Sequence, residues 1–196
     1  DGEEVGDHKG GYLPFSIEID RTEFDLEVRV TDPSDTKEQE RGKQKTKRGG
    51  IWYTPQSGIW QTVWAEKTPK EYIKSIKITP DLKGFSIRVD KEGDGKCILT
   101  LNDISYSLSN NGETRIDISS PRLWSPEDPY LYSFSISFAS DTVYSYVGLR
   151  TFGVGEDEKG VKRLLLNDRP YFHHGLLDQG YWDGGLYTPL SDESMV

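Results

Sequence analysis

The sequence predicts an all-β protein, and three observations lead to this prediction. Only two of the 196 residues are alanine, the best helix former, whereas five are tryptophan and eleven are tyrosine, which favour strands. Apolar and polar residues alternate with a period of two in several short segments, which recur every eight to twelve residues. Turn-forming residues stand between these segments, and no stretch before residue 190 has a sustained helical period.

The first clear alternation is at residues 24–30, where four apolar residues are separated by charged or polar ones. A strand with one solvent-exposed face has this pattern. The same pattern predicts further strands at 85–89, 97–101, 104–108 and 132–138. Turns are predicted at Gly93–Gly95, Asn102–Asp103, Asn110–Gly112 and Asn167–Pro170.

Residues from about 69 to 153 contain about seven strand candidates. This number and this length are typical of an immunoglobulin-like β-sandwich. The apolar positions of the alternating segments are expected to face the interior of the sandwich. Much of its core is therefore predicted to come from Phe85, Ile87, Leu99, Leu101, Phe134 and Ile136.

Charge and hydropathy argue against two classes of partner. The chain has 24 basic and 33 acidic residues, a net charge of −9, so neither nucleic acid nor an anionic membrane is expected as its main partner. No apolar run exceeds three residues, whereas a membrane-spanning helix needs about 20.

The polar segment 32–50 contains five basic residues between 41 and 48 and is interpreted as a solvated loop. A phosphate-binding patch is the alternative, although the interleaved aromatic residues of such patches are missing.

The sequence shows no catalytic or metal-binding motif of a common kind. One cysteine, Cys97, allows no intrachain disulfide and no CxxC site, and it is compatible with a cytoplasmic location. His173 and His174 are followed by Asp178, but adjacent residues of a strand point to opposite faces and cannot both ligate one ion without a bulge. There is also no Gly-x-Ser-x-Gly elbow and no phosphate-binding loop. We therefore expect no metal and no other cofactor.

The ends of the sequence suggest part of a longer protein. The chain begins at Asp1 with neither an initiator methionine nor an apolar leader, and it ends at Val196 just after an acidic, helix-opening stretch. We expect further sequence beyond both ends.

Four segments carry a resemblance to a known family. They read HKGGYLPF at 8–15, GIWYTPQSGIWQTVW at 50–64, PRLWSPEDPYLY at 121–132, and finally GLR, LNDRPYF and LDQGYW between 148 and 182. In this order they resemble glycoside hydrolase family 2, which includes β-galactosidases, β-glucuronidases and β-mannosidases. The most specific pair is SGIWQ at 57–61 and LWSPEDPYLY at 123–132, about 60 residues apart.

The resemblance implies a modular arrangement of domains. Residues 1–68 would be the C-terminal half of a sugar-binding jelly roll, and residues 69–153 a complete immunoglobulin-like sandwich. Residues 154–196 would be the opening hairpin and first strand of a (β/α)8 catalytic barrel, truncated before its first helix is complete. The family implies hydrolysis of β-glycosidic bonds by a retaining mechanism with two glutamates.

Neither glutamate of that mechanism is expected in this chain. The family's acid/base glutamate directly follows an asparagine, whereas the four asparagines here precede Asp103, Asn111, Gly112 and Asp168. The family's nucleophile lies on a still later barrel strand. The chain is therefore expected to be inactive alone, with a carbohydrate substrate and the rest of the barrel as partners of the intact protein. Homo-oligomerisation stays open.

The substrate-binding candidates lie in two places. Residues 171–177 are predicted as the first barrel strand, so Asp178, Gln179, Tyr181 and Trp182 would emerge at its C-terminal end, where barrels carry their active sites. Asp178 would accept hydrogen bonds from sugar hydroxyls and Trp182 would stack on a sugar ring; alternatively, Asp178 braces its loop. Trp52 and Tyr53, on a glycine-flanked loop, either line the cleft or pack between domains.

Two further interpretations remain. Segment 121–132 contains three prolines and is expected to be a loop, with Trp124, Tyr130 and Tyr132 packing against one end of the sandwich rather than forming a sugar platform. The chain as a whole has an alternative function as a free-standing carbohydrate-binding or adhesive β-sandwich module. A purely structural immunoglobulin-like linker is a third option. Residues 154–196 favour the family resemblance, because a finished module needs no additional hairpin and polar tail.

Overall fold

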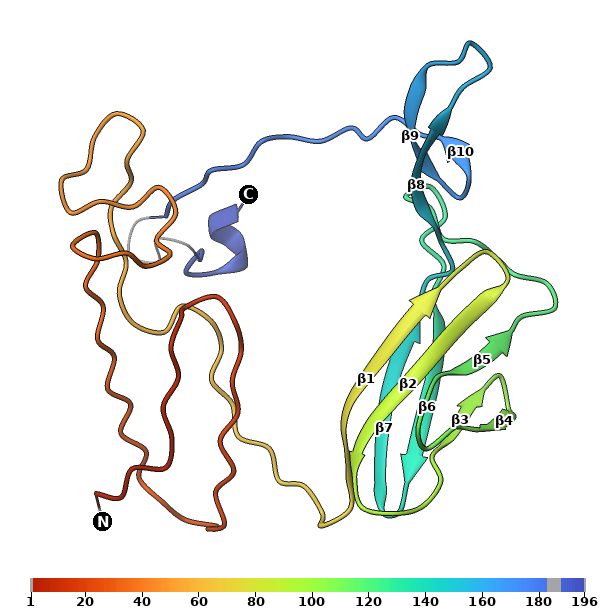
Figure 1. Cartoon of the computed structure of the whole chain (residues 1–196), viewed down its shortest axis with the longest axis horizontal. Helices are drawn as coiled ribbons and strands as arrows, with labels where there is room; N and C mark the ends of the chain where they lie inside the picture. Colours follow the sequence, from red (N-terminus) through yellow and green to blue (C-terminus); the bar gives the residue numbers. More distant parts are fainter. Residues whose placement is uncertain (1, 183–187, 196) are drawn as a thin grey trace. The chain divides into compact units, whose positions relative to one another are not determined.

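The computed structural model describes residues 2–182 and 188–195 (Figure 1). The chain divides into two compact units, residues 1–64 with 177–196 and residues 65–176, hereafter unit 1 and unit 2. All named strands of the described residues lie in unit 2, in three antiparallel sheets. The described residues contain no α-helix, and their single helical element is the 3-10 turn η1 (Asp192–Met195). The all-β prediction is confirmed.

Seven strands of unit 2 form an immunoglobulin-like sandwich. One sheet has the order β1-β2-β5, with β1 at Tyr72–Pro80, β2 at Gly84–Glu92 and β5 at Thr114–Asp117. The other has the order β4-β3-β6-β7, with β4 at Ile104–Ser107, β3 at Ile98–Leu101, β6 at Tyr132–Phe138 and β7 at Asp141–Val147. The fourth strand pairs with the third, whereas in immunoglobulin constant domains it joins the first sheet.

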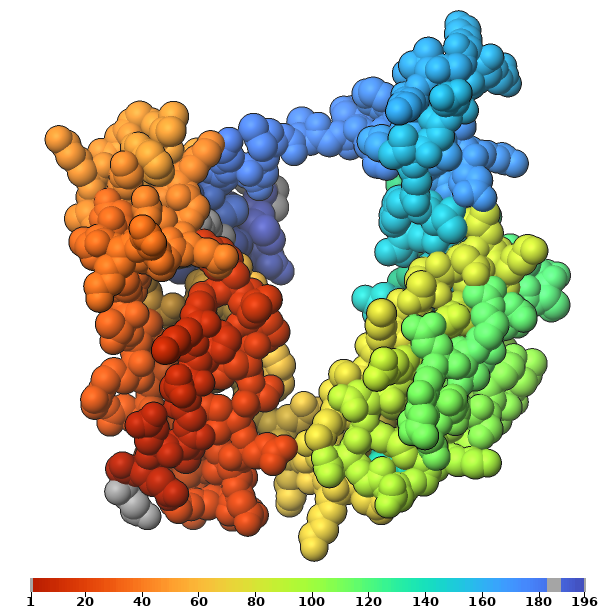
Figure 2. All heavy atoms as spheres, in the orientation of Figure 1, coloured from red at the N-terminus to blue at the C-terminus, as the bar shows by residue number. Residues whose placement is uncertain are grey.

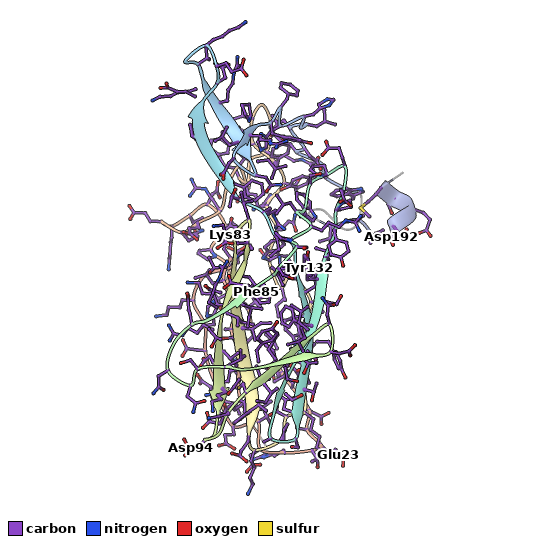
Figure 3. The ribbon with its side chains drawn as sticks, turned by 90° about the vertical axis from the view of Figure 1, so that its right-hand side faces the viewer. Glu23, Lys83, Phe85, Asp94, Tyr132 and Asp192 are labelled. Atoms are coloured by element: carbon purple, nitrogen blue, oxygen red, sulfur yellow. The ribbon has the colours of Figure 1, made fainter. Side chains whose placement is uncertain are left out.

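The core of the sandwich lies between these two sheets. All six predicted core residues are buried, and the rings of Phe85 and Phe134 stack across the sheets with centroids 5.7 Å apart. Figure 3 shows Phe85 and Tyr132 between the sheets, with Lys83 and Asp94 toward opposite ends of the sandwich. In the space-filling view the yellow and green atoms of this region form one continuous body (Figure 2). Each fully buried aromatic or aliphatic side chain stabilises the fold by about 1.5–3 kcal/mol.

Segment 121–132 closes one end of the sandwich as a loop, as its prolines predict. The backbone N–H of Trp124 donates to Leu149 O at 2.9 Å, and that of Arg122 donates to Tyr132 Oη at 2.7 Å. The guanidinium of Arg122 lies over the Tyr130 ring, 4.4 Å from its centroid, and also binds the Asp128 carboxylate. These contacts agree with the packing interpretation of the loop.

A separate small sheet follows the sandwich within unit 2. It has the order β10-β9-β8, with β8 at Phe152–Glu156, β9 at Lys162–Leu166 and β10 at Arg169–Pro170. Asn167 and Asp168, which connect β9 to β10, have φ values of 54° and 61°. Two consecutive positive φ angles are the mark of a type I′ turn, in which Asn and Asp are among the favoured residues.

Two predicted strands are not strands in the structure, and these expectations were wrong. Residues 24–30 make no ladder with another segment, and Phe24 is 43% exposed. Residues 171–177 form one backbone bond to the hairpin, from Tyr171 N to Leu164 O, and one within the segment, from His174 N to Phe172 O, but they pair with no strand, and Leu176 is 94% exposed. A strand is stabilised by its neighbours, and the described residues supply no partner strand at either place. No helix in the described part is long and apolar enough to cross a membrane.

Candidate functional site

Residues 41–56 of unit 1 form a loop with two turns, and its hydrogen bonds fix the backbone of Trp52 and Tyr53. The N–H of Tyr53 donates to Lys43 O at 2.7 Å, and the N–H of Lys45 donates to Tyr53 O at 3.2 Å. Gly49 and Trp52 exchange two backbone hydrogen bonds of 3.0 and 3.1 Å across a tight turn. The turn requires positive φ at Gly49 and Gly50, a conformation that glycine adopts without steric cost. Trp52 and Tyr53 are both half-buried.

Three of the six predicted binding residues meet in one cluster within unit 1. Tyr53 Oη donates to Gln179 Oε1 at 2.7 Å. The rings of Tyr53 and Tyr181 stack with centroids 4.9 Å apart and planes 14° from parallel, and Tyr181 Oη donates to Thr54 O at 3.4 Å. Gln179 lies 126 residues beyond Tyr53 in the sequence. The fold therefore brings the loop and the segment 178–182 together through side chains.

Two lysines belong to this cluster, although the sequence suggested a solvated loop or a phosphate-binding patch for them and no part in a sugar site. Lys43 Nζ donates to the same Gln179 Oε1 at 3.5 Å, and Lys45 Nζ lies 4.1 Å from the centroid of the Trp52 ring. Between them Gln44 is buried, and its Oε1 accepts the backbone N–H of Gln56 at 2.7 Å. The alternation of the two lysines with Gln44 was the signal available in the sequence, since it places both lysines on one side of an extended segment.

The other two predicted residues of the segment 178–182, Asp178 and Trp182, lie on either side of Gly180 in the sequence. Asp178 Oδ1 accepts the backbone N–H of Gly180 at 2.8 Å, and Trp182 Nε1 donates to Ser194 O at 3.3 Å. A Cβ built on Gly180 would lie 3.1 Å from Asp178 Oδ1 and 3.3 Å from the Trp182 ring, so both side chains border this glycine. Asp178 thus braces its own turn, as one of the two interpretations of its role requires.

This arrangement offers the groups that hold a polyhydroxylated ring. The phenol and the amide form a directional hydrogen-bonding pair, the two lysines donate, and the indoles and phenols present flat apolar faces. Among the described residues named in this cluster, Asp178 supplies the one carboxylate. The cluster is therefore suited to binding and orientation rather than to acid–base chemistry at a glycosidic bond, which needs two facing carboxyl groups.

A second cluster, in unit 2, joins the sandwich to the small sheet. Asn167 Nδ2 donates to Trp124 O at 3.0 Å, and Asn167 Oδ1 accepts the N–H of Thr151 at 3.1 Å. Tyr171 Oη donates to Glu127 Oε1 at 2.7 Å. This hydrogen bond lowers the pKa of Glu127 and raises the pKa of Tyr171, because it favours the charged carboxylate and the neutral phenol. Apart from Thr151, the residues of this cluster come from the third and fourth segments of the family resemblance.

No group of three or more histidine, cysteine or acidic side chains in residues 2–182 and 188–195 is placed to hold a metal ion. His173 instead contacts its own segment, with Nδ1 3.1 Å from Tyr171 O.

Comparisons with known proteins give a consistent relationship. The profile of the family described as "Glycosyl hydrolases family 2" matches residues 14–150. The chain is 22% identical over 199 residues to a β-glucuronidase of Streptococcus agalactiae, covering 89% of this chain and 33% of that protein. It is 27% identical over 207 residues to a β-galactosidase of Thermoanaerobacter pseudethanolicus, covering 89% of this chain and 26% of that protein.

Among solved structures, the β-glucuronidase of Faecalibacterium prausnitzii is similar to 53% of this chain, with 28% identity and a TM-score of 0.44; the match covers 18% of that protein. The chain thus spans a quarter to a third of the length of the two curated relatives named above.

Proposed function

Because the chain belongs to glycosyl hydrolase family 2, we propose that it is the non-catalytic part of an enzyme that hydrolyses β-glycosidic bonds with retention of configuration. The names of its relatives support this reaction, since they include β-glucuronidases and a β-galactosidase. The acid/base glutamate would lie outside this chain, because none of its four asparagines is followed by glutamate. The nucleophile, which the family places on a later barrel strand, would lie outside it too.

The proposal includes a division of labour along the chain. Residues 1–68 would complete a sugar-binding jelly roll, residues 69–153 would be the sandwich, and residues 154–196 would open the catalytic barrel. The partners of the chain would be a carbohydrate substrate and the rest of that barrel. Trp52, Tyr53, Asp178, Gln179, Tyr181 and Trp182 would bind the sugar.

One observation carries the binding role: the contact of Tyr53 with both Gln179 and Tyr181. These residues come from two of the segments that resemble the family. Four backbone hydrogen bonds hold the loop 41–56. This loop meets the segment 178–182 through one amide, two phenols and one lysine. A preorganised set of this kind orients a substrate at low entropic cost.

Glycosidase assays test the reaction. The 196-residue chain and the longest natural protein that contains it would both be incubated with aryl β-glucuronides, β-galactosides and β-mannosides. We expect turnover of at least one substrate by the long protein and none by the chain. Turnover by the repurified chain would contradict the assignment of the chemistry to residues outside it. A long protein without activity on any β-glycoside would favour the alternative, a free-standing carbohydrate-binding or adhesive module.

Two variants of the long protein test the proposed sugar-binding role of Asp178 and Trp182. If Asp178 binds a sugar hydroxyl more strongly in the transition state, Asp178→Ala should lower kcat/KM by about one to two powers of ten. Trp182→Ala should mainly raise KM, because stacking holds ground and transition states about equally. A well-folded Asp178→Ala enzyme with wild-type kcat/KM would show that Asp178 braces its own turn and does not bind the sugar.

A further inference from the structure

The outer face of the four-stranded sheet of the sandwich has an unusual composition. Pairing across β4, β3, β6 and β7 places every second residue on this face, opposite the buried ones. The outward residues are Ile98, Thr100, Ser105, Ser107, Ser133, Ser135, Ser137, Thr142, Tyr144 and Tyr146. None is charged, although charged residues make up 29% of the chain.

The outer face of the other sheet provides the comparison within the same domain. There Lys77 lies opposite Arg88 on β1 and β2, and Arg115 of β5 binds the carboxylates of Asp81 and Asp117. This is the usual solvent-facing surface of an antiparallel sheet, with charges of both signs. Solvent exposure alone therefore does not explain the lack of charges on the four-stranded sheet.

Two tyrosines dominate the uncharged face. Tyr144 and Tyr146 are 82% and 63% exposed, and they stand on the same side of β7, about 6.8 Å apart along the strand. Ser135 lies opposite Tyr144 and Ser133 opposite Tyr146 on the neighbouring strand β6. The short serines beside the tall rings leave an open hollow of about 500 Å³, with Thr100 on its far side.

The Asn102–Asp103 turn borders the same hollow. Both residues have positive φ, 49° and 62°, in the tight connection between β3 and β4. The rim thus has an amide and one carboxylate on a tight turn, and the polar side chains of the floor carry hydroxyl groups, next to Phe134.

We propose that this hollow, formed by Tyr144, Tyr146, Ser133, Ser135, Thr100 and the Asn102–Asp103 turn, binds a neutral oligosaccharide chain. Hydroxyl groups both donate and accept hydrogen bonds, as sugar hydroxyls do, and tyrosine rings give flat apolar area at low conformational entropy. The site lies on the sandwich and involves none of the residues assigned to the glycosidase cleft.

The composition of the face separates this ligand from other classes. An anionic polymer such as nucleic acid needs lysine or arginine, and the face has neither. A protein partner or a second copy of the chain needs an apolar centre, whereas Ile98 is the single aliphatic residue on this face. The composition therefore favours a hydroxyl-rich, uncharged chain as the ligand.

Native affinity electrophoresis of the 196-residue chain tests the proposal. The gels would contain, one at a time, the neutral glycans laminarin, galactomannan and xylan, or the anionic polygalacturonate. We expect at least one neutral glycan to retard the chain, and the double variant Tyr144→Ala/Tyr146→Ala to weaken that retardation at least tenfold. Ser135→Gln, which fills the floor but keeps both rings, should also weaken it. The matched control, Thr79→Ala/Ser86→Ala on the outer face of the other sheet, should be retarded as the wild type is.

Several outcomes would overturn the proposal. They are no retardation by any neutral glycan, retardation by polygalacturonate alone, or retardation that survives both the double variant and Ser135→Gln. A dimer in gel filtration that the double variant dissociates would instead assign the face to a second copy of the chain. Circular dichroism of each variant verifies the fold, which substitutions of exposed tyrosines should leave intact.

Discussion

The same sequence pattern has two different outcomes in the two units. Phe85 of β2 and Phe24 of unit 1 both belong to segments in which apolar and polar residues alternate. Phe85 is fully buried between two sheets, whereas Phe24 is 43% exposed on a segment without a partner strand. Alternation therefore predicts which side chains share a face, but it does not predict whether another strand and another sheet will cover that face.

Different interactions hold each unit together. Unit 2 is stabilised by strand ladders and by a core to which both sheets contribute. Unit 1 depends on individual contacts, such as the Tyr53–Tyr181 stack, the stacked rings of His8 and Phe15, and the hydrogen bond from Trp60 Nε1 to Gly11 O. Each such contact is worth about 0.5–1.5 kcal/mol, less than one buried phenylalanine.

The largest expected effect contrasts two phenylalanines. Phe134→Ala should lower the free energy of unfolding of the sandwich by about 3–5 kcal/mol, because it removes a buried ring and leaves a cavity. Phe24→Ala should change the free energy of unfolding of unit 1, to which it belongs, by less than about 0.5 kcal/mol, because the ring is exposed. Urea unfolding followed by circular dichroism measures both. Equal losses from the two variants would show that residues 24–30 are covered in solution.

A smaller effect is expected at the joint between the sandwich and the small sheet. Asn167→Ala loses the side-chain bonds to Thr151 and Trp124 and puts alanine, which tolerates positive φ less well than asparagine does, at a φ of 54°. We therefore expect this variant to lower the free energy of unfolding by about 2 kcal/mol. Asn167→Gly is the matched control: it loses the same bonds but adopts the turn freely, so its loss should be about half as large. If thermal unfolding finds both variants as stable as the wild type, Asn167 does not join the two sheets.

The smallest effect concerns acid pH. Arg115, which binds the Asp81 carboxylate, lowers the pKa of Asp81 from 3.8 to about 2. A folded-state pKa below the unfolded one stabilises the fold above about pH 4, and this contribution is lost as the pH falls from about 4 to about 2. Asp81→Asn should therefore flatten the acid limb of a stability–pH profile in this window, modestly because the pair is partly exposed. An unchanged acid limb would mean that the pair does not form in solution.

The strands and turns of the sandwich were predicted well, because the patterns that indicate them span only a few neighbouring residues. The alternation at 132–138 placed Phe134 and Ile136 in the core, and the asparagine–aspartate pair at 167–168 predicted a tight turn. The candidate binding cluster was harder to predict. Tyr53 and Gln179 were each candidates, but nothing in either segment indicates that they meet, and Lys43 reaches an amide 136 residues away. Such contacts depend on tertiary packing, which a single sequence does not encode in any local pattern.

We propose that Tyr53 and Gln179 act together to bind sugar in a glycosidase whose catalytic residues lie outside this chain. The most direct test is a double-mutant cycle with Tyr53→Phe and Gln179→Ala in the longest natural protein that contains this chain, followed by steady-state kinetics. Each single variant should raise KM about fivefold with kcat nearly unchanged, and the double variant should be little worse than either, because both remove the same hydrogen bond. Wild-type KM in all three folded variants would contradict the claim.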